Sequence, residues 1–260
     1  MNQQIIKTSD FNFIVEATKN VDQNTLIVFD VDEVLFQPKD QVLRAKFQQF
    51  IDKFEKIVHN MSHPENQVDY HSLILLKRQI SPVNDGFINL IANLQNDNIK
   101  VVALTHCLSG EFGNIKSVAD WRLGELQNIG YNFVHSWPNL DEQILETNSA
   151  ENVESLPLFK QGVLFTNGTP KGLVLEAFLR YSGYVPNKII FVDDLAVNIA
   201  SVSEAAVRLN VEYIGIEYVA ADELETAPLN EKRAEVQLRK LISEREWLND
   251  GQIDKLANNL

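Results

Sequence analysis

The chain has 260 residues, of which 45% are hydrophobic and 23% charged, and these proportions exclude a wholly disordered protein. Lys and Arg number 23 against 36 Asp and Glu, which gives a net charge of −13. This charge argues against binding to nucleic acid or to anionic membranes, because both partners require clustered cations. A phosphorylated partner would also be repelled, so a local cation or metal must supply the attraction.

The sequence also bears on the cellular compartment. A single cysteine, Cys107, permits no intrachain disulfide, which fits a reducing compartment. The N-terminus has no apolar run of signal-peptide length, and no stretch reaches the roughly 18 apolar residues that span a bilayer. We therefore expect a soluble cytoplasmic protein by default, with export that uses no N-terminal signal left open. No pattern indicates the oligomeric state.

Short apolar runs without polar alternation divide the chain. They are TLIVFDV (25–31), IKVVALT (99–105), GVLFT (162–166), KIIFVDD (188–194) and VEYIGIEY (211–218). Such runs are typical of strands buried on both faces of a parallel sheet. Residues with helical apolar spacing lie between them, over 83–97 and 172–181. The alternation predicts an α/β fold, a Rossmann-like three-layer sandwich with a central, mostly parallel sheet.

Two segments lie outside this alternation of strands and helices. Residues 37–81, after the first predicted strand, have apolar residues at three-to-four spacing and suffice for a small helical cap insert, but not for an independent domain. Near the C-terminus one helical face runs from Leu238 to Leu248, and Asn249-Asp250-Gly251 predicts the end of that helix. The predicted division is a core of 1–36 and 82–220, a helical cap insert of 37–81, and a C-terminal helical extension of 221–260.

Acidic residues end two of the predicted strands. Asp30 ends the first run, with Asp32 two residues later, and Asp193 and Asp194 end the fourth. Open α/β sheets bind ligands at this end of their strands. Asp also caps helices, so for either pair alone a helix cap and a ligand site are equally good explanations. If the two strands are neighbours, the carboxylates converge, and at about 4 Å two charges repel by roughly 4 kcal/mol at an effective dielectric constant of about 20. Convergence then requires protonation or a hard cation, and oxygen ligands favour Mg²⁺.

Other polar side chains follow the remaining strand ends. Thr105 ends the second run and can donate a hydrogen bond to a phosphate oxygen, and Lys171 follows the third run in NGTPKG. Each alone is more often a helix cap or a solvated lysine, but the chain order Asp-x-Asp, Thr, Lys, Asp-Asp favours a joint site. His106 either contacts substrate or fills a loop. Cys107 shows no sign of activation and is expected to be structural.

This order of residues resembles the haloacid dehalogenase (HAD) superfamily of phosphotransferases. VFDVDEVL is similar to the first motif of that superfamily, LTH to the second, the lysine of NGTPKG to the third and FVDDLAVN to the fourth. The resemblance covers about residues 25–218 and implies that the core is HAD-like. A closer resemblance, to a poorly characterised bacterial HAD-like group, lies in SPVNDGF, IKVVALT, PKGLVLEAFL and IIFVDD.

The resemblance implies a role for each matching residue. Asp30 would be the nucleophile that attacks phosphorus and forms an aspartyl-phosphate. Asp32 would be the general acid for the leaving group and then the base for water, with its main-chain carbonyl on the metal. Thr105 and Lys171 would bind the transferring phosphoryl group, and His106 is a further candidate for substrate binding.

The metal implied by the resemblance is Mg²⁺, held by Asp30, Asp32 and the second acidic pair. Asp194 would be the direct ligand because Asn198 follows it at the spacing of the resembled motif, and Asp193 would lie behind it or act through water. The pair could also be registered one residue differently. Asn198 stands where the motif has Asp, which removes one negative charge and implies weaker metal binding.

These residues predict a Mg²⁺-dependent phosphatase that hydrolyses a phosphate monoester, either a small molecule or a phosphoprotein. The resemblance also gives weight to the acid at position 32. Ion pumps of the HAD superfamily tend to have Thr there and its dehalogenases lack this acid, so Asp32 favours hydrolysis of a phosphate ester. Two alternatives stay open: phosphoryl transfer to a second acceptor, as in a sugar mutase, and a protein that keeps the fold but acts by binding a partner. A response-regulator receiver is excluded, because its acidic pair comes first in the chain.

Overall fold

The structure is a computed structural model that describes residues 2–61, 65–147, 156–224 and 227–257. The chain forms two compact units. Unit 1 comprises residues 1–36, 82–109 and 118–221, and unit 2 comprises residues 37–81, 110–117 and 222–260. The predicted cap insert and the C-terminal extension thus fall in one unit, together with a short segment from the middle of the chain. Residues 62–64 of the predicted insert lie outside the described residues.

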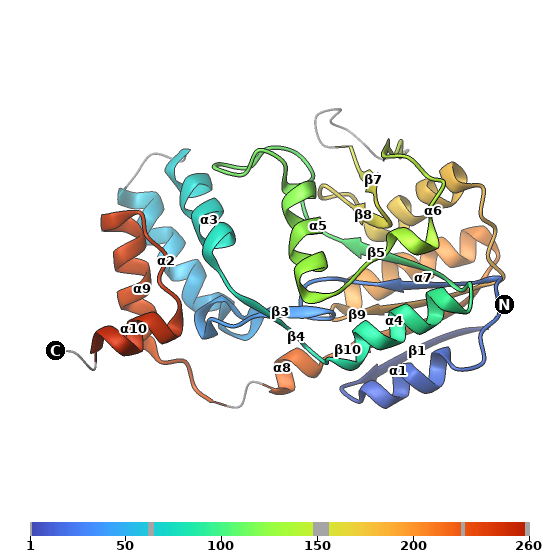
Figure 1. The fold of residues 1–260 in the computed structure, drawn as a ribbon, viewed down its shortest axis with the longest axis horizontal. Coiled ribbons are helices and arrows are strands. Elements are labelled where there is room, and N and C mark those ends of the chain that lie inside the picture. The colour runs from blue at the N-terminus through green and yellow to red at the C-terminus, as the bar shows by residue number, and fades with distance from the viewer. Residues whose placement is uncertain (1, 62–64, 148–155, 225–226, 258–260) are drawn as a thin grey trace. The chain divides into compact units, whose positions relative to one another are not determined.

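A mostly parallel sheet forms the centre of unit 1 (Figure 1). Within the described residues it has eight strands, in the order β1-β10-β9-β2-β5-β8-β7-β6. They are β1 (Gln3–Thr8), β2 (Thr25–Phe29), β5 (Lys100–Thr105), β6 (Gln143–Ile144), β7 (Leu158–Lys160), β8 (Val163–Phe165), β9 (Lys188–Asp193) and β10 (Glu212–Tyr218). The pairs from β1 to β8 in this order are parallel, and β7 pairs antiparallel with both neighbours. The predicted fold class is confirmed.

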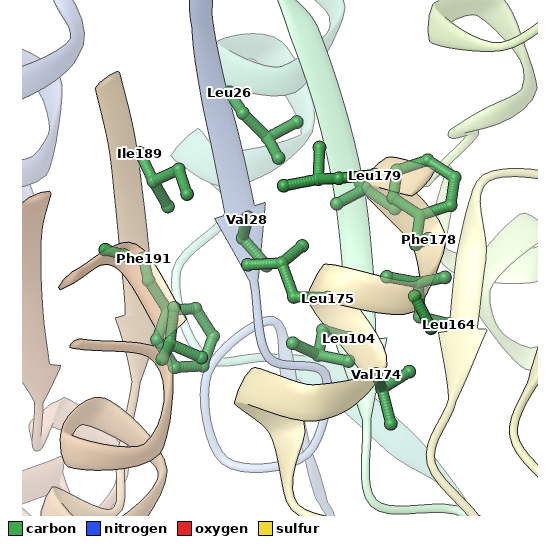
Figure 2. Close-up of a cluster of buried hydrophobic side chains, with 14 of the residues drawn as sticks. Leu26, Val28, Leu104, Leu164, Val174, Leu175, Phe178, Leu179, Ile189 and Phe191 are labelled. Atoms are coloured by element: carbon green, nitrogen blue, oxygen red, sulfur yellow. The ribbon is translucent and has the colours of Figure 1, made fainter. Parts of the chain in front are cut away.

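Helices cover both faces of this sheet and make the outer layers of the sandwich. They are α1 (Phe11–Thr18), α4 (Gly86–Asn96), α5 (Val118–Ile129), α6 (Lys171–Ser182) and α7 (Ala196–Leu209), with a 3-10 turn η3 (Val134–Ser136). In Figure 2, Leu26 of β2 points toward Leu179 of α6 and Val28 points toward Leu175, within one buried cluster that also includes residues of α7. On the other face, Phe87 of α4 packs edge-to-face on Phe29 of β2, with ring centroids 5.6 Å apart.

The core explains why the apolar runs predicted the strands. Leu26, Val28, Ile189 and Phe191 are all fully buried, and burial of each such side chain contributes about 1.5–3 kcal/mol. A strand covered on both faces has no polar positions, so its sequence is unbroken. The predicted first strand is nevertheless the second: β1 precedes it and pairs with β10 at the edge of the sheet that the described residues form. Four of the six residues of β1 are exposed, so it has no apolar run to reveal it.

Unit 2 is helical. It contains the 3-10 turns η1 (Gln41–Leu43) and η2 (Ala45–Phe47) and the helices α2 (Gln48–Met61), α3 (Glu65–Lys77), α9 (Glu231–Glu244) and α10 (Asp250–Ala257). The chain enters the insert through β3 (Phe36–Pro38) and leaves it through β4 (Ile80–Pro82), which pair with each other, and α8 (Ala220–Leu224) follows β10. Buried residues of α3 and α9, including Tyr70, Leu238 and Leu241, form the core of the unit.

The C-terminal helix ends earlier than predicted. Arg245 takes a left-handed φ of 54°, which ends α9 after Glu244. Asn249-Asp250-Gly251, predicted to stop that helix, instead begins α10, because the Asn249 side chain accepts a hydrogen bond from the main-chain N–H of Gln252 at 3.0 Å. Short polar residues occur at both ends of helices, so the sequence signal was assigned to the wrong helix.

A buried polar network joins the insert to the C-terminal helices within unit 2. Asp40 is 1% exposed and accepts hydrogen bonds from Trp247 Nε1 and from the main-chain N–H of Asp250, both at 2.9 Å. Gln237 donates to the Leu248 carbonyl and to Asp250, both at 3.0 Å. Burial raises the pKa of the Asp40 carboxyl, and the hydrogen bonds from Asp250 and Trp247 oppose that rise. These bonds fix the start of the insert to the end of the chain.

Candidate functional site

Three carboxylates converge where β2 and β9 end. The two strands are parallel neighbours with Phe29 opposite Val192, so Asp30 follows beside Asp193, and the Asp30 N–H donates to the Val192 carbonyl at 2.9 Å. Asp30 is 6% exposed and Asp193 is fully buried. One carboxylate oxygen from each of Asp30, Asp193 and Asp194 lies within 4.8 Å of the others. The register of two strands therefore gathers acids that are far apart in the chain.

Lys171 lies among these carboxylates. Its Nζ donates to Asp30 Oδ1 at 2.5 Å and to Asp193 Oδ2 at 2.6 Å, and the side chain is 1% exposed. Lys171 is the first residue of α6, and the next residue, Gly172, lies where α6 packs on α7. The Gly172 N–H donates to Ser201 Oγ of α7 at 3.0 Å, and a Cβ at Gly172 would collide with the Ser201 carbonyl. The close packing of α6 on α7 thus places the Lys171 side chain beside the carboxylates.

Burial and mutual repulsion set the charge states of the group. Burial raises the pKa of the Asp30 carboxyl well above its ordinary value, with Lys171 opposing the rise and Asp193 and Asp194 adding to it. Burial, with the charge of Asp193, raises the pKa of Asp194 to about 6. Burial alone would lower the pKa of Lys171, but Asp30 and Asp193 outweigh it and the pKa is raised. A single lysine therefore faces three carboxylates that it cannot fully neutralise.

The two acids of the second pair differ in their surroundings. Asp193 has both oxygens engaged: Oδ2 accepts from Lys171, and Oδ1 accepts from the Leu195 N–H and from Asn198 Nδ2, each at 2.9 Å. Asp194 is only partly buried. Asn198, which the sequence spacing associates with Asp194, therefore supports Asp193 in the structure. Of the two acids, Asp194 is therefore the more accessible to solvent.

The donor set of this centre fits a hard divalent cation. Three carboxylates with one lysine leave surplus negative charge, and carboxylate oxygens are the ligands that Mg²⁺ prefers. Among the residues that the structure describes, this is the one group of three or more His, Cys, Asp or Glu side chains at such distances. Asp30 and Asp194 are the residues that could hold such an ion directly, since Asp193 is occupied by its hydrogen bonds.

The Asp32 carboxylate is not part of this group. It is 43% exposed and forms an ion pair with Arg122, with 3.1 Å between Arg122 Nη2 and Asp32 Oδ2. Arg122 Nη1 also binds Glu125 Oε2 at 3.0 Å, and its Nη2 lies 3.9 Å from Cys107 Sγ. The metal contact predicted for Asp32 uses its main-chain carbonyl, so that contact stays a prediction.

Arg122 was missed by sequence reasoning. It lies in the middle of α5, not after a strand, and with Glu125 three residues later it has the spacing of an ordinary surface ion pair. Its side chain is nevertheless only 5% exposed. A usable signal was present, because Arg122 shares the buried face of α5 with Ala119 and Leu126, at a spacing that predicts an inward-facing residue.

Thr105 and His106 lie at the same edge of the sheet as the acids. Thr105 ends β5, which is the other neighbour of β2, and it is fully buried, with its Oγ1 accepting from the Cys107 N–H at 3.3 Å. His106 is exposed, and its Nδ1 lies 3.4 Å from Thr166 Oγ1. The structure thus brings Asp30 and Lys171 into one cluster with the second acidic pair, while the substrate roles of Thr105 and His106 stay predictions.

The fold and the site define an α/β protein with a carboxylate–lysine centre at the carboxyl edge of a parallel sheet. The chain belongs to the family described as "Protein of unknown function (DUF2608)", whose model matches residues 7–254. The assignment to the HAD superfamily is therefore wrong: the family that matches nearly the whole chain is this one, and no HAD family matches. Short motifs at strand ends were too small a part of the chain to identify its family.

Several bacterial proteins are similar to the chain. An uncharacterized protein of Rickettsia prowazekii (strain Madrid E) is 23% identical over 98% of this chain and 92% of its own length. Proteins of Chlamydia trachomatis and Chlamydia muridarum, each named "Putative outer membrane protein", are 26% and 23% identical over 85% and 84% of this chain, and over 78% of their own length in both cases. No solved structure matches the chain. Among the described residues, no helix has the length and apolar character to cross a bilayer.

Proposed function

We propose that the chain is a Mg²⁺-dependent phosphatase that hydrolyses a phosphate monoester, with Asp30 as the nucleophile. The observation that carries the proposal is the position of Asp30: a buried carboxylate at a strand end, bound by Lys171 and facing two further carboxylates. Such a centre is too negative to be complete without cationic charge, and a phosphate ester with a divalent cation supplies the matching chemistry.

The residues divide the reaction between them. An oxygen of Asp30 attacks phosphorus, so that a new bond joins the carboxylate to phosphorus while the bond to the ester oxygen breaks. Lys171 holds Asp30 in one orientation and offers positive charge to the phosphoryl oxygens. The Thr105 hydroxyl donates to one of those oxygens. Asp32 gives a proton to the departing oxygen, then takes one from the water that releases phosphate from Asp30.

The proposed cation would bind at the carboxylate–lysine centre and supply positive charge there. Asp30, Asp194 and the main-chain carbonyl of Asp32 would hold it. When bound, Mg²⁺ supplies positive charge that favours the transferring phosphoryl group and the ionised form of Asp30. Ionisation of Asp30 is otherwise disfavoured by burial, which raises its pKa. This coupling predicts that Asp30 acts as a nucleophile only in the metal-bound protein.

The charge of the chain sets a condition on the substrate. A net charge of −13 repels a phosphorylated small molecule or phosphoprotein at long range. Binding therefore depends on the short-range attraction of the cation and Lys171. Because the Debye length is about 8 Å at physiological salt, added salt screens the long-range repulsion and is expected to lower KM.

The test is a phosphoenzyme trap combined with turnover. Purified protein with Mg²⁺ is incubated with 4-nitrophenyl phosphate labelled at phosphorus, and the reaction is quenched in acid. We expect turnover that stops with a chelator, and labelled protein whose label is released by hydroxylamine, which cleaves acyl phosphates. Turnover without labelled protein would reject Asp30 as the nucleophile, and no turnover with any phosphate ester would reject the phosphatase.

For the location of the protein, we propose the cytoplasm. The single Cys107 forms no intrachain disulfide, which supports a reducing compartment. The name that the two Chlamydia relatives carry makes the outer membrane the alternative. Fractionation of the native cells into cytoplasm and outer membrane, followed by antibody detection, separates the two: recovery in the outer membrane fraction would contradict the proposal.

A further inference from the structure

Arg122 is buried and is held by two aromatic rings and two carboxylates. Its guanidinium carbon lies 5.1 Å from the ring centroid of Phe36 and 5.0 Å from that of Trp121, and Glu125 binds Nη1 at 3.0 Å. Burial lowers the pKa of Arg122, but the charges of Asp32 and its other neighbours outweigh burial and leave the pKa raised. The guanidinium is therefore a fixed, permanent cation.

Asp32 has much less to hold it. Its side chain is 43% exposed, and at that exposure a carboxylate without a fixed partner samples several rotamers. The bond from Arg122 Nη2 to Oδ2, at 3.1 Å, selects one of these orientations. It also leaves Oδ1 as the oxygen that is available for proton exchange. The sequence distance of 90 residues between the two means that only the fold creates this contact.

The buried guanidinium has one further unusual feature. Arg122 Nε is buried and has no hydrogen-bond partner in the described structure. Leaving a buried N–H unpaired costs about 1–3 kcal/mol, so this arginine lowers the stability of the fold by roughly that amount. An arginine needed only for packing between two rings could be replaced by an uncharged residue, which suggests that the charge and the fork of Arg122 serve Asp32.

We propose that Arg122 is a positioning residue that holds the Asp32 carboxyl group where it exchanges a proton with the leaving group. The inference rests on the proposed phosphatase function. In the first step the proton moves from Asp32 Oδ1 to the ester oxygen as the bond from that oxygen to phosphorus breaks. In the second step Oδ1 takes a proton from the attacking water. Arg122 binds Oδ2 throughout and contacts no reacting atom.

The experiment uses leaving groups of different acidity on the full-length protein with Mg²⁺. The substrates are 4-nitrophenyl, phenyl and benzyl phosphate, which are similar in shape, while their alcohols become progressively weaker acids. A weakly acidic alcohol needs a proton as it leaves, and 4-nitrophenol does not. The variants are Asp32→Asn, Arg122→Lys and the double variant. Arg208→Lys is the matched control, because Arg208 forms an exposed ion pair with Glu176, 2.6 Å long, at the far end of α7.

Loss of positioning predicts a dependence on the leaving group. Asp32→Asn should lower kcat for benzyl phosphate by about 10²–10⁴-fold, the range for a general acid, and should change kcat for 4-nitrophenyl phosphate far less. Arg122→Lys keeps the charge but loses the planar fork, so it should show the same pattern with a loss of about 10-fold or more on benzyl phosphate. The double variant should match Asp32→Asn, because residues that act as a unit are non-additive. Arg208→Lys should behave as wild type.

Several results would overturn the inference. Equal losses of Arg122→Lys on all three esters, or losses that add to those of Asp32→Asn, would mean that Arg122 does not act through Asp32. If wild type hydrolyses none of the esters, the proposed function fails and this inference fails with it. Circular dichroism and thermal unfolding check each variant. If Arg122→Lys does not fold, Glu125→Gln replaces it, since it loosens Arg122 from the other side and should give the same pattern with a smaller loss.

Discussion

Asp30 in unit 1 and Asp40 in unit 2 are both buried aspartates whose pKa is raised by burial. Asp40 accepts hydrogen bonds from Trp247 and Asp250, one at each oxygen, so the fold itself supplies its donors. Asp30 has Lys171 on one oxygen and two more carboxylates beside it. The comparison shows that burial of an acid does not identify a site. The feature that distinguishes Asp30 is the excess of carboxylates over the donors and cations that the fold supplies.

The largest expected effect is that of Asp30→Asn. Because a covalent route needs its nucleophile, we expect kcat for 4-nitrophenyl phosphate to fall by about 10⁴-fold or more. The free energy of unfolding without metal should stay the same or rise, since one of three repelling carboxylates becomes neutral. Turnover and urea unfolding measure the two effects. Wild-type rates in a contaminant-free preparation of this variant would end the assignment of Asp30.

Lys171→Ala should have the next largest effect. Removal of one electrostatic stabiliser should cost about 2–4 kcal/mol of transition-state stabilisation, measured as kcat/KM with Mg²⁺. Lys188→Ala is the matched control, because Lys188 begins the same strand that Asp193 ends and forms a partly exposed ion pair with Glu212. Full activity of the Lys171 variant would show that another cation serves the phosphoryl group.

The stability of the metal-free protein should depend on pH through Asp194. Its pKa is about 6 in the folded protein against 3.8 when unperturbed, so the folded state binds more protons between these values. The free energy of unfolding from this group should therefore fall as pH rises from about 4 to about 6, by about 3 kcal/mol at most, since one pKa unit is about 1.4 kcal/mol. Urea unfolding in a chelator, for wild type and Asp194→Asn, measures it. Parallel curves for the two proteins would refute this dependence.

Asp40→Asn should have the smallest effect and should leave catalysis unchanged. Asn has one acceptor oxygen where Asp40 uses two, so either Trp247 Nε1 or the Asp250 N–H would face an NH₂ group. We expect a loss of about 1–2 kcal/mol in the free energy of unfolding, the cost of a lost buried hydrogen bond. Turnover of 4-nitrophenyl phosphate should equal that of wild type. A loss of activity in the stably folded variant would remove the contrast between the two aspartates.

The sequence predicted the parts of unit 1 that depend on burial and strand ends. Runs such as KIIFVDD predicted both a buried strand and the place where its acids emerge, because a strand covered on two faces tolerates polar residues only at its ends. Lys171 was found in the same way, from its place after a strand. The sequence also predicted a helical insert, but it gave no sign that the insert and the C-terminal helices share one unit.

The features that the sequence did not predict depend on contacts across the fold. Arg122 binds an acid 90 residues away, and its nearer partner Glu125 suggests an ordinary surface pair. Asn198 follows Asp194 at a suggestive spacing, yet the first turn of α7 directs its amide to Asp193. The family was predicted wrongly because the prediction used four short motifs around the carboxylate–lysine centre. The family model, in contrast, matches residues 7–254.

The most direct test of the central claim is a calorimetric titration of the metal-free protein with Mg²⁺. Asp194→Asn and Asp40→Asn are titrated beside the wild type, because the first neutralises an acid of the carboxylate–lysine centre and the second neutralises the buried acid of unit 2. We predict one Mg²⁺ bound per chain in wild type and in Asp40→Asn, and binding that is lost in Asp194→Asn. An absence of binding in wild type, or unchanged binding in Asp194→Asn, would contradict a cation at the carboxylate–lysine centre.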